Sequence, residues 1–276
     1  MIHRILVPLD PSPYSDVALD YACKFAQEHN AELTGIVVLD LPGISKSIGP
    51  VPHGGLYYAE KLEKYREHEA NKQIKKTLSK FRTKCEKEKV VFLESERLGS
   101  PEKIISDDSM FYDLVLMGLK NYFHFETKGG DQTSVDDLLD YSITPILAVP
   151  SVYIEIKNVL VAFDGSLAAA RALQGFAHLA ARYNYQITVL ISHPDKEVGN
   201  YYLDQAELYL KTYSVSCAEK RWTLEPILHV LKTTYFEQSD MIVAGVHSKR
   251  GLAKYFVGSV AKYLIEEAKK PLFLSP

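Results

Sequence analysis

The stretch that begins at Gly245 carries residues whose types and spacing suit them to hold a phosphate group. Gly245 and Ser248 are followed, after nine intervening residues, by Gly258 and Ser259 at the start of an expected helix. Glycines in such turns let backbone N–H groups approach phosphate oxygens closely, and a helix N-terminus adds free donors and a favourable dipole. His247 and Ser259 add side-chain donors nearby. The pattern predicts an anion-binding loop; the alternative is that both glycines serve only a turn and a helix start.

An aspartate closes a short apolar run in each half of the chain, at Asp10 and at Asp164. Each is followed by a turn and then by a serine, Ser12 or Ser166, that opens an Ala-rich helix. Ligands of open α/β sheets bind at the carboxyl ends of the strands, where the strand order reverses. Asp164 is therefore expected close to Gly245, within reach of the same ligand. The alternative role for both aspartates is to end a strand and cap the next helix.

The chain repeats itself, and this internal repeat decides its architecture. Three segments of the first half return in the second: Ile5–Ser12 as Leu160–Ser166, Asp113–Gly118 as Asp240–Gly245, and Pro145–Val149 as Pro271–Leu274. The second copy is 28 residues shorter, mostly after its second strand. We therefore predict two domains, residues 1–152 and 156–276, that meet near residues 151–157.

The first copy lacks the phosphate loop of the second. Counted back from the closing proline, Gln132 and Thr133 stand where the second copy has glycine and serine. Acidic residues crowd the same helix start, at Asp131, Asp136 and Asp137. Carboxylates there stabilise a helix and repel an anion for the same reason. The first domain is therefore expected to bind no nucleotide or an altered ligand.

Apolar periodicity predicts strands that alternate with helices in both halves. The strands are expected at 2–9, 33–39, 90–94, 114–117 and 146–149, and again at 159–163, 186–191, 214–220, 241–244 and 272–274. Helices are expected at 12–30, 57–88, from 100, and at 134–142, then at 166–183, 200–212, 226–235 and 259–268, with a Gly/Pro-rich loop at 41–55. This alternation predicts parallel sheets with helices on both faces.

Composition indicates an ordinary cytoplasmic protein. The chain of 276 residues is 46% apolar and 24% charged, and its net charge of −3 does not favour nucleic acid as a partner. No apolar run reaches the roughly 18 residues that cross a bilayer, and no secretion signal opens the chain. Three cysteines without a CxxC pair are expected to be buried and inert, and the histidine spacings do not predict a metal site.

Eleven Lys/Arg and six Asp/Glu lie between Glu60 and Lys89, in the longest expected helix. This charge run predicts a solvated helix face, and the alternative is a surface for an anionic partner. In the second half, four residues stand at helical spacing and are expected to pack in the core or at an interface: Tyr202, Ala206, Tyr209 and Tyr213. The alternative is a platform on which a base stacks.

The two copies resemble the universal stress protein family in tandem. Many members bind ATP through G-x2-G-x9-G-[ST], with an Asp after the first strand at the adenosine. Asp164, Gly245, Gly258 and Ser259 match this pattern, and Ser248 replaces its second glycine. The resemblance implies two Rossmann-like, flavodoxin-type domains, each with a mainly parallel five-stranded sheet. It also implies that the closing strands of the two copies pair, which gives a pseudo-dimer within the chain.

The same resemblance implies a nucleotide site in the second domain. Asp164 and Ile191 would hold adenine and ribose, and the phosphates of ATP, with or without Mg²⁺, would lie against residues 245–248 and 258–260. The full set of expected contacts is Ala162, Asp164, Ile191, Ala244, Gly245, His247, Ser248, Gly258, Ser259 and Val260.

We therefore expect an ATP-binding regulatory protein of the stress response, cytoplasmic and either monomeric or a homodimer. Efficient turnover is not expected, because the sequence has no GxxxxGK[ST] loop and no carboxylate pair for Mg²⁺. The alternative is a nucleotide-free interaction or scaffold protein with the same fold. A third class, adenylyl transferases and ATP pyrophosphatases, would need an HxGH or SGGxDS motif that the sequence lacks.

Overall fold

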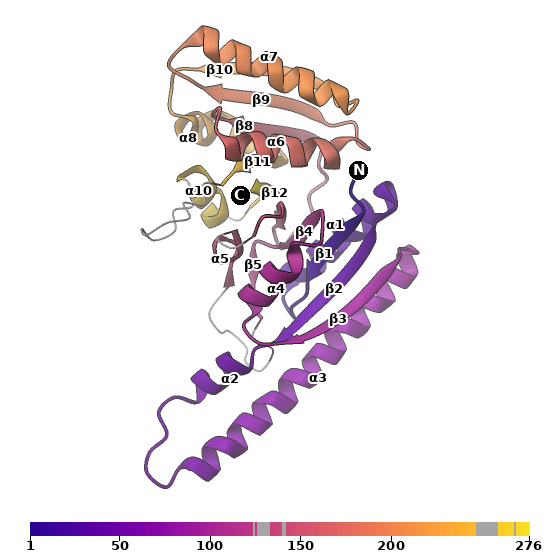
Figure 1. Cartoon of the computed structure of the whole chain (residues 1–276), viewed down its shortest axis with the longest axis vertical. Coiled ribbons are helices and arrows are strands. Elements are labelled where there is room, and N and C mark those ends of the chain that lie inside the picture. The colour runs from indigo at the N-terminus through magenta and orange to yellow at the C-terminus, as the bar shows by residue number, and fades with distance from the viewer. Residues whose placement is uncertain (124, 126–132, 140–141, 247–258, 268) are drawn as a thin grey trace.

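In the computed structural model the described residues are 1–123, 125, 133–139, 142–246, 259–267 and 269–276, and ten of their strands form one continuous sheet (Figure 1). The strand order across this sheet is β10-β9-β8-β11-β12-β7-β4-β1-β2-β3. The first-half strands are β1 (Arg4–Pro8), β2 (Glu32–Leu39), β3 (Phe92–Leu98), β4 (Leu114–Gly118) and β7 (Ile146–Val149). The second-half strands are β8 (Asn158–Phe163), β9 (Gln186–Ser192), β10 (Cys217–Thr223), β11 (Met241–Gly245) and β12 (Leu272–Ser275).

All strands within each half are parallel, and both halves have the same order. Numbered within its own half, each set runs 3-2-1-4-5. The predicted α/β class with two tandem Rossmann-like five-stranded sets is confirmed. The order is that of the Rossmann fold, whereas flavodoxin has 2-1-3-4-5. In both halves the order reverses between the first and fourth strands, so ligands are expected at β1/β4 or at β8/β11.

The two halves join edge to edge in the middle of the sheet. β7 and β12 pair antiparallel, with Leu147 opposite Phe273 and Ile146 opposite Leu274. This is the pairing of closing strands that was expected between the two copies. All of these side chains are buried. The junction is therefore part of the core and makes the two halves one sheet.

Helices cover both faces of the sheet. One face carries α1 (Pro13–His29), α3 (Leu56–Glu88), α6 (Leu167–Ala180) and α7 (Lys196–Thr212). The other face carries α4 (Pro101–Ser109), α5 (Val135–Leu139), α8 (Ile227–Val230), the π-helix η1 (Leu231–Tyr235), α9 (Phe236–Gln238) and α10 (Ser259–Glu267). Strand side chains alternate between these two layers: Ile5 and Val7 of β1 face the first, and Leu6 faces the second. Such burial on both sides explains why the strands are apolar throughout.

Serine caps start the helix that follows the first strand of each half. Ser12 precedes α1, and its side chain accepts a hydrogen bond from the Ser15 N–H at 3.3 Å. Ser166 precedes α6 and accepts from the Ala169 N–H at 3.1 Å. Pro13 fills the first helical position, where its missing N–H costs nothing. These caps fix where the chain leaves the carboxyl ends of β1 and β8.

The structure differs from the sequence expectation after β2. The segment 41–55 was expected to be a loop, but it contains α2 (Leu41–Ile48). Asp40 caps this helix through the Gly43 N–H at 2.9 Å, and a proline occupies its first turn. A cap and an early proline start a helix even in a Gly/Pro-rich stretch.

Two further boundaries differ. The helix expected at 226–235 is divided into α8, η1 and α9. α7 begins four residues before the expected start, because Asp195 caps it through the N–H groups of Glu197 (2.8 Å) and Val198 (3.2 Å).

After β4, two short strands, β5 (Lys120–Asn121) and β6 (Thr133–Ser134), form a separate antiparallel pair.

The cysteines are free thiols; Cys23 and Cys85 are buried as expected, and Cys217 is half-buried. Every helix among the described residues is too short or too polar to span a bilayer. In the same part of the chain, no three His, Cys, Asp or Glu side chains converge on a common metal position.

Candidate functional site

The carboxyl ends of β8, β9 and β11 bring five of the expected ligand contacts to one edge of the sheet. Ala162 in β8 lies opposite Ala244 in β11, and Ile191 lies near the end of the neighbouring strand β9. Asp164 follows β8 directly, and Gly245 ends β11. These residues are therefore neighbours in space, as the switch in strand order predicts.

Burial separates these residues into two groups. Ala162, Ile191 and Ala244 are buried, and the Ile191 side chain packs in the core beneath α6 and α7. Val260, also expected at the site, packs against the core of the opposite face from α10. In this arrangement a ligand at the edge would meet mainly the backbone of these four residues. The Asp164 side chain, by contrast, is exposed.

Gly245 is required for close packing at this edge. A Cβ atom added there would lie 2.3 Å from the backbone carbonyl carbon of Ala168 and 2.3 Å from the Ala169 nitrogen. The absence of a side chain thus lets the end of β11 approach the first turn of α6. The glycine therefore has a structural role whether or not it also binds phosphate.

Part of the expected phosphate loop lies outside the described residues. His247, Ser248 and Gly258 fall in this part, as do Asp131 and Gln132 of the first copy. Ser259 opens α10, a helix of 9 residues, and the structure describes its backbone but not its side chain. The phosphate contacts therefore stay predictions.

The two strand-ending aspartates have opposite surroundings. Asp10 is 2% exposed, and its Oδ1 accepts from the Ser12 N–H at 2.9 Å and from the Ser12 hydroxyl at 2.5 Å. Its Oδ2 accepts from the Tyr122 N–H, which comes from the segment after β4. Burial raises the pKa of Asp10, and these hydrogen bonds oppose the rise. The place that a ligand would take beside Asp10 is thus filled by the protein's own backbone.

Asp164 keeps half of its carboxylate open. Its Oδ1 accepts from the Ser166 N–H at 2.9 Å, which repeats the Asp10–Ser12 contact. Among the described residues no other hydrogen bond reaches this carboxylate. Within the described part of the chain, the second oxygen of Asp164 is therefore open to a hydroxyl or amino group of a ligand.

Aromatic rings lie near Asp164, among them Tyr202, for which the sequence favours a core or interface role over a base-stacking one. Tyr202 of α7 lies over Gly165, whose φ is +76° and whose added Cβ would be 3.2 Å from the ring. The same ring lies 6.2 Å from that of Phe163 and 6.2 Å from that of His193, between ring centroids. Helical spacing predicted Tyr202 as a core residue, and it does pack against the core. Periodicity cannot show that the ring also reaches the end of β8.

Comparisons with known proteins agree with this architecture. The sequence model of the Universal stress protein family matches residues 1–126 and 219–276. No match is found among curated protein sequences.

Solved structures match the chain over nearly its whole length. A universal stress protein from Archaeoglobus fulgidus DSM 4304 superimposes with a TM-score of 0.65 at 17% identity, over 99% of this chain and 97% of that chain. A putative universal stress protein from Pseudomonas aeruginosa UCBPP-PA14 gives 0.60 at 13% identity, over 99% and 93%. A protein of unknown function from Pseudomonas aeruginosa PAO1 gives 0.60 at 14%, over 99% and 92%. These superpositions show the fold. The match of the family model to more than half of the chain shows the family: the chain belongs to the universal stress protein family.

Proposed function

We propose that this protein is a stress-response regulator that binds an adenine nucleotide, ATP or a close relative, at the carboxyl edge of its second half. The observation that carries the proposal is the exposed carboxylate of Asp164 at the end of β8, beside β11. In dinucleotide-binding α/β proteins a carboxylate at this edge of the sheet, at the end of the second strand, accepts a hydrogen bond from a ribose hydroxyl, and Asp164 offers the same group from the end of the first strand of its half. The family resemblance gives the same position to the adenosine.

The surroundings of Asp164 suit the rest of a nucleotide. The rings of Tyr202 and His193, 6.2 Å apart between centroids, supply flat surfaces near the strand end where a base would lie. The first N–H groups of α10 have no partner within the helix, so phosphates at that end would gain donors and a favourable dipole. The sequence motif assigns the phosphates to this helix start.

One nucleotide per chain is proposed. Asp10 is the counterpart of Asp164, but its carboxylate is already occupied by Ser12 and Tyr122. Binding at the first half would require the Tyr122 N–H to leave a buried carboxylate. Breaking this hydrogen bond is unfavourable, because a buried polar group left without a partner destabilises the folded protein by about 1–3 kcal/mol or more.

The nucleotide is proposed to act as a bound signal without efficient turnover. The sequence lacks a GxxxxGK[ST] loop, and hydrolysis at such a site would be slow. Turnover by the purified protein that disappears in Asp164→Ala would overturn this part of the proposal.

Two measurements test binding. One sample of the purified protein is denatured, and mass spectrometry identifies any nucleotide that it releases. A second, native sample is titrated with ATP by calorimetry in the presence and absence of Mg²⁺. We expect one site per chain. Asp164→Ala should weaken it by about tenfold or more, because a hydrogen bond to a charged group contributes about 1.5–3 kcal/mol. Gly258→Asp should also weaken it, because it adds a carboxylate that repels the phosphates.

Asp10→Asn is the matched control, since it changes the equivalent carboxylate of the first half. It should leave the affinity for ATP unchanged. The absence of both bound nucleotide and heat of binding in the wild-type protein would reject the proposal and favour a nucleotide-free interaction protein.

A further inference from the structure

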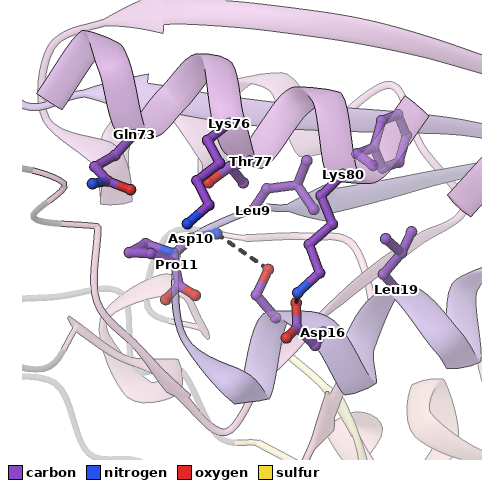
Figure 2. A pocket seen from close by; sticks show the side chains of 11 residues that line it. Leu9, Asp10, Pro11, Asp16, Leu19, Gln73, Lys76, Thr77 and Lys80 are labelled. Atoms are coloured by element: carbon purple, nitrogen blue, oxygen red, sulfur yellow. Dashed lines mark hydrogen bonds and ion pairs between the residues drawn. The ribbon is translucent and has the colours of Figure 1, made fainter. Parts of the chain in front are cut away.

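A cavity of about 130 Å³ lies in the first half, between α1, α3 and the end of β1 (Figure 2). Leu9 and Phe81 form apolar parts of its lining. The remaining lining residues come from the turn after β1, from α1 and from α3: Asp10, Pro11, Ser15, Asp16, Leu19, Gln73, Lys76, Thr77 and Lys80. This set is separate from the segment after β4, so the cavity is distinct from the phosphate loop expected in the family.

Four polar side chains of α3 line this cavity, and three of them lie beside the Lys80–Asp16 ion pair. Gln73, Lys76 and Thr77 stand at i, i+3 and i+4, a spacing that places them on one face of the helix. Figure 2 shows Lys76 extending from α3 toward the turn at Asp10 and Pro11. Among the described residues none of the three side chains has a hydrogen bond or ion pair. An ammonium, a hydroxyl and an amide thus offer several unused donors to the same small space.

The acidic side chains of the lining already have partners. Asp16 forms an ion pair with Lys80 at 2.5 Å. Asp10 accepts from Ser12 and from the Tyr122 N–H, as described above. Hydrogen bonds from neutral donors leave the charge of Asp10 in place, so the two carboxylates and the two lysines of the lining carry no net charge together. Within the described part of the chain, Lys76 is the lysine of the lining that has no ion pair, so its ammonium group is open to an anion.

At the equivalent position of the second half, an aromatic side chain occupies the space that is a cavity in the first half. Buried residues align α3 with α7: Ile74, Leu78, Phe81 and Cys85 of α3 correspond to Gly199, Leu203, Ala206 and Leu210 of α7. Both helices are followed by a residue in the left-handed conformation, Lys89 or Ser214.

In this register Thr77 corresponds to Tyr202, and Lys76 corresponds to Tyr201. The Tyr202 ring packs on Gly165, the counterpart of Pro11. An aromatic ring thus occupies in the second half the space that Thr77 leaves open in the first.

We propose that the cavity of the first half binds a small tetrahedral oxyanion, either inorganic phosphate or the phosphoryl group of a small ester. Lys76 supplies the charge, and Gln73 and Thr77 supply further donors. The volume suits this class, since a water molecule takes about 30 Å³ and phosphate with a few waters fills the remainder. The proposal is independent of nucleotide binding in the second half.

Calorimetry with inorganic phosphate tests the proposal on the full chain. We use the Gly258→Asp background, which removes the expected phosphate loop of the second half. One phosphate per chain should bind. Lys76→Gln should weaken this binding by about tenfold, because it removes the unpaired charge. Lys75→Gln is the matched control: it removes the neighbouring lysine, which is exposed and does not line the cavity, and should change nothing.

Thr77→Tyr supplies an independent variant. It copies the residue of the second half, should fill the cavity, and should abolish phosphate binding while the thermal unfolding curve stays cooperative. When Lys76→Gln and Thr77→Tyr are made in the otherwise wild-type chain, ATP binding through Asp164 should persist in both, so failure of one site is distinguishable from failure of the other.

Glycerol 3-phosphate, titrated in parallel, distinguishes an ester from the free anion by its relative affinity. The proposal is overturned if neither compound binds in the Gly258→Asp background. It is also overturned if Lys76→Gln and Lys75→Gln have equal effects.

Discussion

The environment of an aspartate, rather than its presence, separates the two halves of this protein. Asp10 and Asp164 follow equivalent strands and make the same contact with the serine two residues later. Among the described residues, Asp10 alone also accepts from a backbone N–H of the segment that follows the fourth strand, and the counterpart of Tyr122 in the second half, Lys249, lies outside the described residues. Sequence reasoning placed both aspartates at strand ends, but the path of a loop that covers one of them depends on many tertiary contacts. The closed state of Asp10 was therefore not predictable in detail, although the loss of the glycine motif pointed in that direction.

Gly245 gives a prediction at the same scale. Gly245→Ala would place a Cβ atom 2.3 Å from the backbone of Ala168 and Ala169, so α6 or β11 must shift. We expect the free energy of unfolding to fall by about 2 kcal/mol or more, measured by urea denaturation.

Gly54→Ala is the control for this substitution. Gly54 also has restricted geometry, with φ of +83°, but its added Cβ would meet open space. This change should lower the free energy of unfolding by only about 1 kcal/mol, the cost of placing an alanine in the left-handed backbone conformation. Equal losses for the two variants would show that the contact with α6 relaxes freely.

Helix α3 has two parts with different support. All of its buried residues, namely Ala70, Ile74, Leu78, Phe81 and Cys85, lie in the C-terminal part that packs on the sheet. Residues 56–69 contain none, and in Figure 1 this part extends beyond the sheet together with α2. Sequence periodicity identified the packed stripe correctly, because an apolar face at helical spacing is a strong local signal. It missed α2, whose start depends on a cap at Asp40 rather than on periodicity.

This division predicts different costs for the same substitution along one helix. Leu78→Ala should reduce the free energy of unfolding by about 2–4 kcal/mol, because it opens a cavity in the core. Leu62→Ala, at a position that is 39% exposed, should change it by less than about 0.5 kcal/mol. Both values are obtained from urea denaturation. Similar losses of free energy at the two positions would contradict the conclusion that residues 56–69 lie outside the core.

At the scale of the whole molecule, contacts between the halves go beyond the paired strands. His29 at the end of α1 lies with its Nε2 3.0 Å from the Leu179 carbonyl oxygen of α6, and its Nδ1 lies 3.5 Å from the Ile2 nitrogen. Neutral imidazole satisfies both contacts, with Nε2–H as donor and Nδ1 as acceptor. Burial lowers the pKa of His29. The folded protein therefore takes up this proton less readily than the unfolded chain.

A pH dependence follows from this lowered pKa. Below the ordinary histidine pKa of about 6.5, His29 is protonated in the unfolded chain but stays neutral in the folded protein. The free energy of unfolding therefore decreases as pH falls. The decrease continues until pH reaches the lowered pKa of the folded state. Urea denaturation between pH 7 and pH 5 should show a shallower slope for His29→Gln than for the wild type. His68→Gln, at an exposed position on α3, should keep the wild-type slope, and a slope unchanged by His29→Gln would reject this origin.

The internal repeat made the architecture predictable at this scale. Two copies of one strand pattern imply two similar sheets, and the burial of the strands on both faces appears in the sequence as continuous apolar runs. Pairing between β7 and β12 came from the family resemblance, because periodicity does not identify strand partners. The assignment of nucleotide contacts to individual residues stays a prediction at positions such as His247 and Gly258.

The antiparallel junction of β7 and β12 also limits how the sheet can grow. Each half uses its closing strand to join the other, so only β3 and β10 remain at the margins of the sheet. These outer strands carry charged side chains of both signs: Glu94, Glu96 and Arg97 in β3, and Glu219, Lys220 and Arg221 in β10. Charged outer strands resist the addition of another strand. The ten-stranded sheet is therefore expected not to extend by strand addition at either margin.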